Sequence, residues 1–192
     1  AKAINKPMDN NFELFNKTIL IVGFGRIGKK LIKKCLGFDL KVYVYDPFVD
    51  EKIISSMGGN KIGNLEDGLK IADILSLSLP LNKKTYNLIS LKEMKIMKKN
   101  SIILNISRGG IVNEHDLNNA LENNIISYAG LDVFEKEPPD INNPLLNNKK
   151  VFLSPHAATF TKECLENMSK ETVQNIIDFF DNKIDNSKIV KL

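Results

Sequence analysis

The sequence lacks the features that mark membrane and secreted proteins. No apolar run in the 192 residues approaches the ~20 that a membrane-spanning helix needs. The first residues are polar and mixed, so we expect no signal peptide. The two cysteines, Cys35 and Cys164, lie far apart, which argues against a disulfide framework and favours a reducing compartment. We therefore expect a cytoplasmic protein with no membrane partner.

Arginine is almost absent. Lysine serves nearly everywhere that a cation occurs, and the two arginines are Arg26 and Arg108. A guanidinium presents a planar fork that binds phosphate or carboxylate through two hydrogen bonds, which an ammonium cannot do. Both positions are therefore candidates for recognising an anion. The net charge of +4 does not indicate a nucleic-acid partner, because the lysines are scattered among acids and no nucleic-acid motif is present.

The composition is that of a globular domain, with 43% hydrophobic and 26% charged residues. Apolar β-rich runs alternate with segments of helical spacing. We expect strands at Thr18–Val22, Lys41–Tyr45, Ile74–Leu79, Ser101–Ile106, Ser127–Val133 and Val151–Leu153. We expect helices at Arg26–Leu36, Glu51–Met57, Leu65–Ile71, Leu91–Met97, Glu114–Asn123 and Thr161–Asp181. This alternation predicts an α/β fold with a doubly wound parallel sheet and helices on both faces.

A glycine-rich segment, residues 23–28 (GFGRIG), directly follows the first expected strand and opens the first expected helix. Gly23 allows a tight turn, Gly25 lets the backbone approach a pyrophosphate, and Gly28 lets helix and strand pack closely. At the helix N-terminus, the Ile27 amide and the Arg26 guanidinium can bind phosphate oxygens. This is the dinucleotide-binding fingerprint of a Rossmann fold.

Asp46 supplies the second half of this fingerprint. It ends the second expected strand at about the ~20-residue spacing after the glycines that the fingerprint requires. A carboxylate at this position accepts hydrogen bonds from ribose hydroxyls and repels a 2′-phosphate, so it favours NAD over NADP. The alternative is that Asp46 and Pro47 merely open a turn.

Three later strands are each followed by a residue that can bind or protonate an organic acid. Arg108 follows one strand, Glu135 and Glu137 follow the next, and His156 follows the last. Because ligands of open α/β sheets bind beyond the carboxyl ends of the strands, an arginine, a glutamate and a histidine can converge on one crevice. Alternatively, an isolated Arg or Glu is a surface residue and a lone His is structural, an interpretation that suits His115.

These motifs, in this order, resemble the D-isomer-specific 2-hydroxyacid dehydrogenases, a family that includes phosphoglycerate and hydroxypyruvate dehydrogenases. The resemblance runs from Lys17 to Asn182. It rests on Gly23–Gly28 with Asp46, Leu79–Thr85, Asn105–Val112, and Leu131–Pro138 with Ser154–Thr161. It implies a catalytic trio of Arg108, Glu137 and His156. Beyond the glycine-rich segment and Asp46, it implies that NAD contacts Leu79, Pro80, Thr85, Ile106, Ser107, Arg108, Asp132, His156 and Ala158.

The resemblance implies reduction of a 2-keto acid, and the residue types suit that chemistry. His156 would give the proton to the carbonyl oxygen, because an imidazole titrates near neutral pH. Glu137 would favour the imidazolium and orient the ring; its place directly before Pro138 favours it over Glu135. Arg108 would bind the substrate carboxylate. We expect no metal site.

The sequence also departs from the family. Ala157, Ala158 and Thr159 follow His156, where the family carries a larger aliphatic residue. Members are normally much longer, so we interpret residues 1–16 as an interdomain connecting segment, 17–182 as the NAD-binding domain and 183–192 as a C-terminal tail, with the N-terminal substrate domain absent. The isolated chain is then expected to bind NAD but to be nearly inactive.

Two alternatives remain open at this stage. One is a non-catalytic, NAD-sensing regulatory protein of the corepressor type. The other is a formate dehydrogenase relative, which the resemblance disfavours because that branch carries Gln in place of Glu137. The resemblance further implies a homodimer formed through the region around Ile111–Tyr128.

Overall fold

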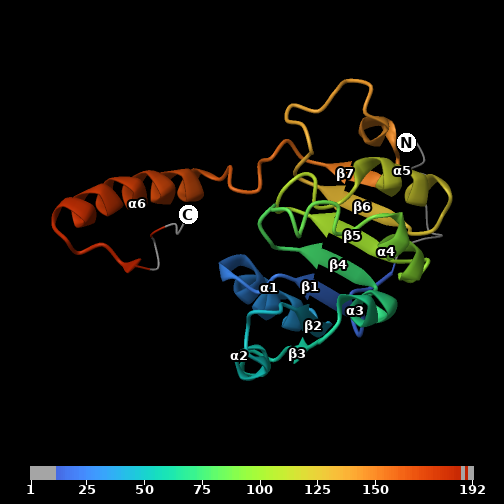
Figure 1. Cartoon of the computed structure of the whole chain (residues 1–192), viewed down its shortest axis with the longest axis horizontal. Helices are drawn as coiled ribbons and strands as arrows, with labels where there is room; N and C mark the ends of the chain where they lie inside the picture. Colours follow the sequence, from blue (N-terminus) through green and yellow to red (C-terminus); the bar gives the residue numbers. More distant parts are fainter. Residues whose placement is uncertain (1–11, 187–188, 190–192) are drawn as a thin grey trace, which may run out of the picture. The chain divides into compact units, whose positions relative to one another are not determined.

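The computed structural model describes residues 12–186 and 189. The chain divides into two units, the first ending at Pro155 and the second beginning at His156 (Figure 1). Most of the expected connecting segment, residues 1–11, and residues 187–188 and 190–192 of the expected tail lie outside the described part of the chain.

The first unit is built on a seven-stranded parallel sheet. Its strands are β1 (Thr18–Val22), β2 (Lys41–Tyr45), β3 (Asn60–Lys61), β4 (Ile74–Leu77), β5 (Ile102–Asn105), β6 (Tyr128–Leu131) and β7 (Val151–Leu153). Their order in the sheet is β3-β2-β1-β4-β5-β6-β7. The chain therefore winds outward from β1 to one edge and then from β4 to the other, and the strand order reverses between β1 and β4. This reversal is the switch point at which open α/β sheets bind ligands.

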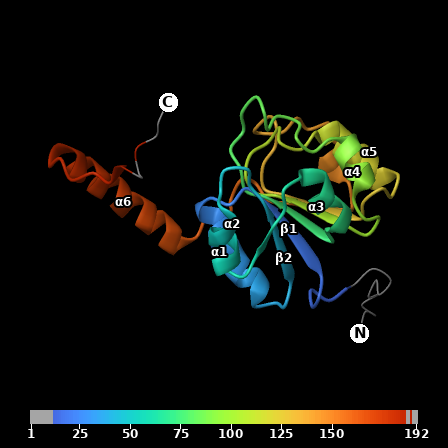
Figure 2. The same cartoon turned by 60° about the horizontal axis from the view of Figure 1, so that its bottom comes forward.

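Helices cover both faces of this sheet. They are α1 (Arg26–Leu36), α2 (Glu51–Ser56), α3 (Leu65–Ile71), α4 (Leu91–Ile96), α5 (Glu114–Glu122) and the 3₁₀ helix η1 (Pro144–Asn147). Helices α1 and α2 lie on one face, and α3, α4 and α5 lie on the other (Figure 2). The prediction of a doubly wound, Rossmann-like α/β fold is confirmed.

The side chains of β1 show why both faces must be covered. Ile19 and Ile21 pack in the core beneath α1 and α2, whereas Leu20 and Val22 pack in the core beneath α3 to α5. All four are buried. A parallel strand buried on both faces appears in the sequence as a continuous apolar run rather than an alternating one.

Capping residues set the starts of several helices. The side chains of Asp50, Asn64 and Asn113 accept hydrogen bonds from backbone N–H groups in the first turns of α2, α3 and α5. Ser90 and Glu93 form a capping box at α4. Each cap satisfies an N–H that has no partner within its helix, and replacing such a cap costs about 1 kcal/mol.

The structure differs from the predicted elements mainly in its short segments. Strand β3 and the 3₁₀ helix η1 are not among the elements predicted from the sequence. Strand β3 is two residues long and has no apolar alternation; it exists because Asn60 and Lys61 pair in parallel with Tyr43 and Val44. Strand β4 ends at Leu77 rather than at Leu79.

The second unit contains α6 (Lys162–Phe180), as its helical spacing predicted. The helix begins at Thr161, whose side chain accepts a hydrogen bond from Cys164 N at 3.2 Å. Across the described residues of both units, no helix is both long and apolar enough to span a membrane.

Candidate active site

The loop between β1 and α1 can be built only with glycine at two positions. Gly23 has a φ of +92°, and a Cβ placed on it would lie 2.4 Å from the backbone oxygen of Ser78. A Cβ on Gly28 would lie 2.4 Å from the backbone oxygen of Gly23. The first turn of α1 is therefore pressed against the loop, and the loop is pressed against the chain that leaves β4.

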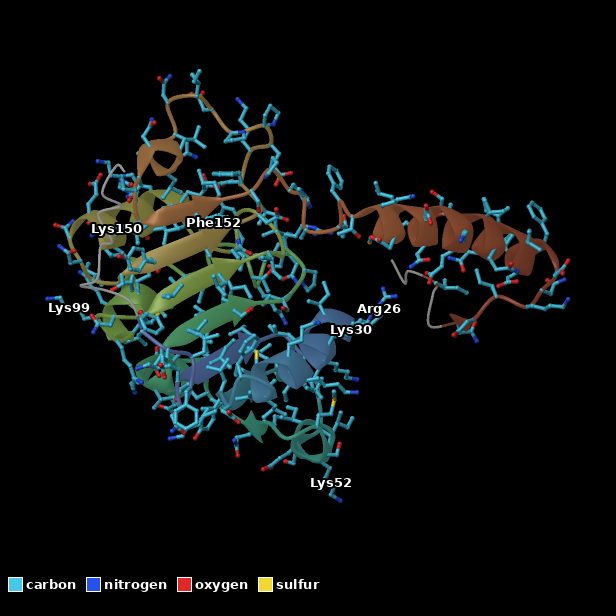
Figure 3. The ribbon with its side chains drawn as sticks, turned by 180° about the vertical axis from the view of Figure 1, so that it is seen from behind. Arg26, Lys30, Lys52, Lys99, Lys150 and Phe152 are labelled. Atoms are coloured by element: carbon cyan, nitrogen blue, oxygen red, sulfur yellow. The ribbon has the colours of Figure 1, made fainter. Side chains whose placement is uncertain are left out.

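The start of α1 is open, in contrast to the starts of the capped helices. Gly25 is the N-cap and makes no side-chain cap, and the first turn of α1 carries no acidic residue. No heavy atom lies within 4 Å of a Cβ placed on Gly25. Arg26 and Ile27 are exposed beside it, and Figure 3 shows the Arg26 side chain extending away from the sheet. A helix N-terminus with space in front of it and a guanidinium beside it fits a pyrophosphate group.

Asp46 is tied to this loop. Its Oδ2 accepts a hydrogen bond from Phe24 N at 2.8 Å, and its Oδ1 accepts one from Phe48 N at 2.9 Å. The second contact is the turn that the sequence analysis left as an alternative, and the first joins the carboxylate to the glycine-rich loop. Each carboxylate oxygen can accept a further hydrogen bond, so both contacts are compatible with binding ribose hydroxyls.

The loop after β4 carries three of the expected NAD contacts, Leu79, Pro80 and Thr85. Thr85 Oγ1 donates a hydrogen bond to the Pro80 carbonyl at 2.7 Å and accepts one from Asn82 N at 2.8 Å. The Cβ of Leu79 lies 3.3 Å from a Cβ built on Gly23, which places this loop against the glycine-rich loop.

The loop after β5 carries Ile106, Ser107 and Arg108. Ile106 and Arg108 are exposed and Ser107 is buried. The Arg108 guanidinium folds back on its own loop, where Nη1 donates to the Ser107 carbonyl at 2.6 Å. Within the first unit, Arg108 lies just beyond the carboxyl end of β5, as the sequence predicts, and β5 is the neighbour of β4, which borders the switch point.

The two glutamates after β6 make different contacts. Glu137 Oε1 accepts a hydrogen bond from Phe134 N at 3.0 Å. Glu135 Oε1 accepts one from Tyr86 Oη at 2.8 Å, and this bond raises the pKa of the Tyr86 hydroxyl. The Glu135 carboxylate therefore ties the loop after β6 to the loop after β4, which favours a structural role for Glu135 and leaves Glu137 as the candidate carboxylate partner of His156.

Asp132 and His156 complete the predicted set. Asp132 is 3% exposed at the end of β6, where its Oδ1 accepts a hydrogen bond from Ser154 Oγ at 2.6 Å. His156 begins the second unit, with a φ of +52°, and is followed by Ala158 two residues later. Because the two units are not placed relative to each other, convergence of His156 with Arg108 and Glu137 stays a prediction. Metal-binding clusters of His, Cys, Asp and Glu are absent from residues 12–186 and 189.

Sequence reasoning missed Asn105 as a site residue. It is the last residue of β5 and is 1% exposed, and its side-chain amide bonds to both Ser107 and Arg108. The available signal was a lone amide at the end of an apolar strand, three residues before one of the two arginines.

Comparison with known proteins agrees with this geometry. Residues 2–158 match the family model described as D-isomer specific 2-hydroxyacid dehydrogenase, NAD binding domain. Over 172 residues the chain is 42% identical to a glyoxylate reductase from Thermococcus litoralis, covering 88% of this chain and 50% of that protein. Over 151 residues it is 39% identical to a D-3-phosphoglycerate dehydrogenase from Methanocaldococcus jannaschii, covering 79% of this chain and 29% of that protein.

A solved structure shows the same likeness in three dimensions. The D-lactate dehydrogenase from Lactobacillus jensenii, solved with NAD⁺, has a TM-score of 0.84 and is 29% identical, covering 98% of this chain and 60% of that one. The chain spans no more than half the length of the two curated relatives, 50% of one and 29% of the other. Because the family model for the NAD binding domain matches residues 2–158, the chain belongs to the D-isomer specific 2-hydroxyacid dehydrogenase family.

Proposed function

We propose that this chain is the cofactor domain of an NAD-dependent dehydrogenase that transfers a hydride between NAD(H) and a small 2-hydroxy or 2-keto acid. The observation that carries the proposal is the open start of α1 at Gly25, with Asp46 tied to the same loop and the exposed Arg108 at the end of a nearby strand. The relatives named above are a glyoxylate reductase, a phosphoglycerate dehydrogenase and a lactate dehydrogenase, which supports this class of substrate.

Three residues of this chain would take part in the reaction. Bound NADH supplies the hydride. Arg108 would bind the substrate carboxylate through its guanidinium and hold the carbonyl beside the nicotinamide. His156 would give the proton to the carbonyl oxygen, and Glu137 would orient the imidazole and favour its charged form. The NAD contacts proposed for the loops after β4, β5 and β6 would position the nicotinamide over the substrate.

We propose that residues 17–182 act as the NAD-binding domain, between a connecting segment (1–16) and a tail (183–192), and that a separate domain binds most of the substrate. The lengths of the relatives support this division, because the chain covers 50% of the glyoxylate reductase.

The two free cysteines support a cytoplasmic location. The expected absence of a nucleic-acid partner rests on the sequence, in which the lysines are scattered among acids. The homodimer through Ile111–Tyr128 rests on the family resemblance, and a monomer in light scattering at tens of micromolar would contradict it.

The proposed reaction is tested by following the oxidation of NADH with glyoxylate, pyruvate or hydroxypyruvate. The chain joined to a substrate-binding domain should turn over at least one of these acids, and the 192-residue chain alone should bind NADH and react very slowly, because domain closure normally orients the substrate and excludes water. NADH binding with no turnover in the joined form would instead support the NAD-sensing alternative.

Asp46 is expected to make the site selective for NADH over NADPH. Its carboxylate can accept hydrogen bonds from ribose hydroxyls and repels a 2′-phosphate. Charge-assisted hydrogen bonds contribute roughly 1.5–3 kcal/mol, so NADH should bind about tenfold to a hundredfold more tightly than NADPH. Asp46→Asn keeps one acceptor oxygen and removes the charge, so it should bring the two affinities together.

Titration by NADH fluorescence or calorimetry measures both affinities. Asp50→Asn is the matched control, because Asp50 makes the same kind of side-chain contact, to Lys52 N at 2.7 Å, at the start of α2. This variant should keep the selectivity of the wild type. Equal affinities for NADH and NADPH in the wild-type chain would show that the role assigned to Asp46 is wrong.

A further inference from the structure

We infer that Asn105 is a positioning residue for Arg108: its buried amide fixes the backbone of the loop that presents the guanidinium. The inference assigns a further residue to the proposed function, and the effect expected on catalysis rests on that function. The geometric part, that Asn105 holds Arg108 in place, can be tested without any enzyme activity.

Both ends of the Asn105 amide are engaged with the loop. Its Oδ1 accepts hydrogen bonds from Ser107 N at 3.2 Å and from Ser107 Oγ at 2.9 Å. Its Nδ2 donates to the Arg108 carbonyl at 2.9 Å. The side chain is 1% exposed, and an amide buried at this depth is costly unless its polar atoms are paired. The loop therefore supplies the hydrogen-bond partners of the buried amide, and the same hydrogen bonds fix the backbone of the loop.

The guanidinium is coupled to Ser107, one of the two residues that the Asn105 amide binds. Arg108 Nη1 donates to the Ser107 carbonyl at 2.6 Å. Ser107 thus binds Asn105 through its N–H and its hydroxyl, while its carbonyl, in the next peptide group, accepts from the guanidinium. A hydrogen bond from a charged donor is about twice as strong as a neutral one, so a movement of the Ser107 backbone moves the guanidinium with it.

The next residue fixes the other side of the loop. A Cβ built on Gly109 would lie 1.8 Å from the Phe134 carbonyl oxygen, so the backbones of the loops after β5 and β6 are in direct contact. Phe134 N also donates to Glu137 Oε1 at 3.0 Å. The segment with Arg108 is therefore held between the Asn105 amide and Phe134, and Phe134 in turn anchors Glu137. Asn105 consequently helps to set the spacing between Arg108 and Glu137.

Only an amide provides this combination of contacts. Aspartate keeps the two acceptor contacts to Ser107 but loses the donor to the Arg108 carbonyl, and its second oxygen then faces that carbonyl. Alanine removes all three bonds and leaves buried groups of Ser107 and Arg108 unpaired. A buried group without its partner costs about 1–3 kcal/mol, enough to favour a different arrangement of a short loop.

The scarcity of arginine makes the geometric test direct. The chain has two arginines, Arg26 and Arg108, so a ¹⁵N NMR spectrum of the 192-residue chain contains two arginine Nε–H signals. The variant Arg26→Lys assigns them. Asn105→Asp and Asn105→Ala should shift the Arg108 signal and speed its solvent exchange several-fold, and they should leave the Arg26 signal in place.

Asn60→Asp is the matched control, because Asn60 Nδ2 likewise donates to a backbone carbonyl, that of Val42, at 3.3 Å, in a strand at the sheet edge. It should leave both arginine signals unchanged. A folded Asn105→Asp variant with an unchanged Arg108 signal overturns the inference. If neither Asn105 variant folds, the wild-type chain decides: the Asn105 side-chain NH₂ should exchange slowly with solvent, and fast exchange overturns the inference.

The catalytic consequence is measured in the form of the protein that reduces 2-keto acids. Asn105→Asp should raise the KM for the acid roughly tenfold to a hundredfold, because a displacement of about 1 Å in a positioning group has an effect of that order. A weaker affinity for NADH with an unchanged KM for the acid would contradict the assignment to Arg108. If the wild type reduces none of the acids, the proposed function fails, and the NMR comparisons still decide the role of Asn105.

Discussion

Arg108→Lys is expected to lower kcat/KM for a 2-keto acid by about a hundredfold or more, in the form of the protein that turns over. Lysine keeps the charge but cannot make two parallel hydrogen bonds to a carboxylate. Its single nitrogen would have to serve both the substrate and the Ser107 carbonyl, which Arg108 binds through Nη1 alone, so the cation is positioned less firmly. Loss of a positioned group that orients the substrate has an effect of this size. Steady-state kinetics with NADH saturating measure it.

Arg26→Lys is the internal control, because Arg26 is the other arginine and is exposed at the start of α1. It should change the affinity for NADH by a small factor and leave the KM for the acid unchanged. A mild effect of Arg108→Lys would mean that the fork geometry of the guanidinium does not matter, and the role proposed for Arg108 would be wrong.

Most of the fold could be predicted because the sheet is buried on both faces. Strand β1 carries the continuous apolar run Ile19–Val22, β4 is apolar except for Ser76, and the glycines after β1 mark the first crossover. The elements that escaped prediction, β3 and η1, are short and held by neighbours rather than by their own pattern. Strand β3, for example, is held by parallel pairing with β2.

Some residues of the candidate site could likewise be predicted from the sequence, and others could not. The glycine-rich loop, Asp46 and Arg108 could be found from the sequence because their chemistry and their place after a strand are local properties. The contacts of Asn105 reach only two and three residues along the chain, but they depend on how the loop turns after β5. The bond from Tyr86 to Glu135 joins loops that are far apart in the chain. Such contacts depend on the register of strands β4, β5 and β6, which a single sequence does not reveal.

The chemistry of the side chains alone could not decide which of Glu135 and Glu137 has the catalytic role. Both are exposed carboxylates in one loop, two residues apart. The structure separates them by partners: Glu135 accepts from Tyr86 of another loop, whereas Glu137 accepts from Phe134 N in its own loop. Phe134 is also the residue whose carbonyl contacts the loop of Arg108, so the loops that carry the two proposed catalytic groups of the first unit share one backbone junction.

Gly25→Ala is expected to abolish measurable NADH binding without destabilising the fold. Gly25 has a φ of −74°, which alanine adopts without strain, and a Cβ there meets no heavy atom within 4 Å. The change in the free energy of unfolding should therefore stay within about 0.5 kcal/mol. The same empty space is where the pyrophosphate would approach the backbone, so the added methyl group would occupy the position of the phosphate oxygens.

The matched control is Gly37→Ala, at the other end of the same helix. Gly37 is the C-cap of α1 with a φ of −67°, and a Cβ there makes only an ordinary contact, 3.4 Å from the Lys34 carbonyl oxygen. This variant should keep both the stability and the NADH affinity of the wild type. Thermal unfolding and NADH titration on the three proteins separate the two effects. If Gly25→Ala binds NADH as tightly as Gly37→Ala, the pyrophosphate does not lie at the start of α1, and the nucleotide site must be placed elsewhere.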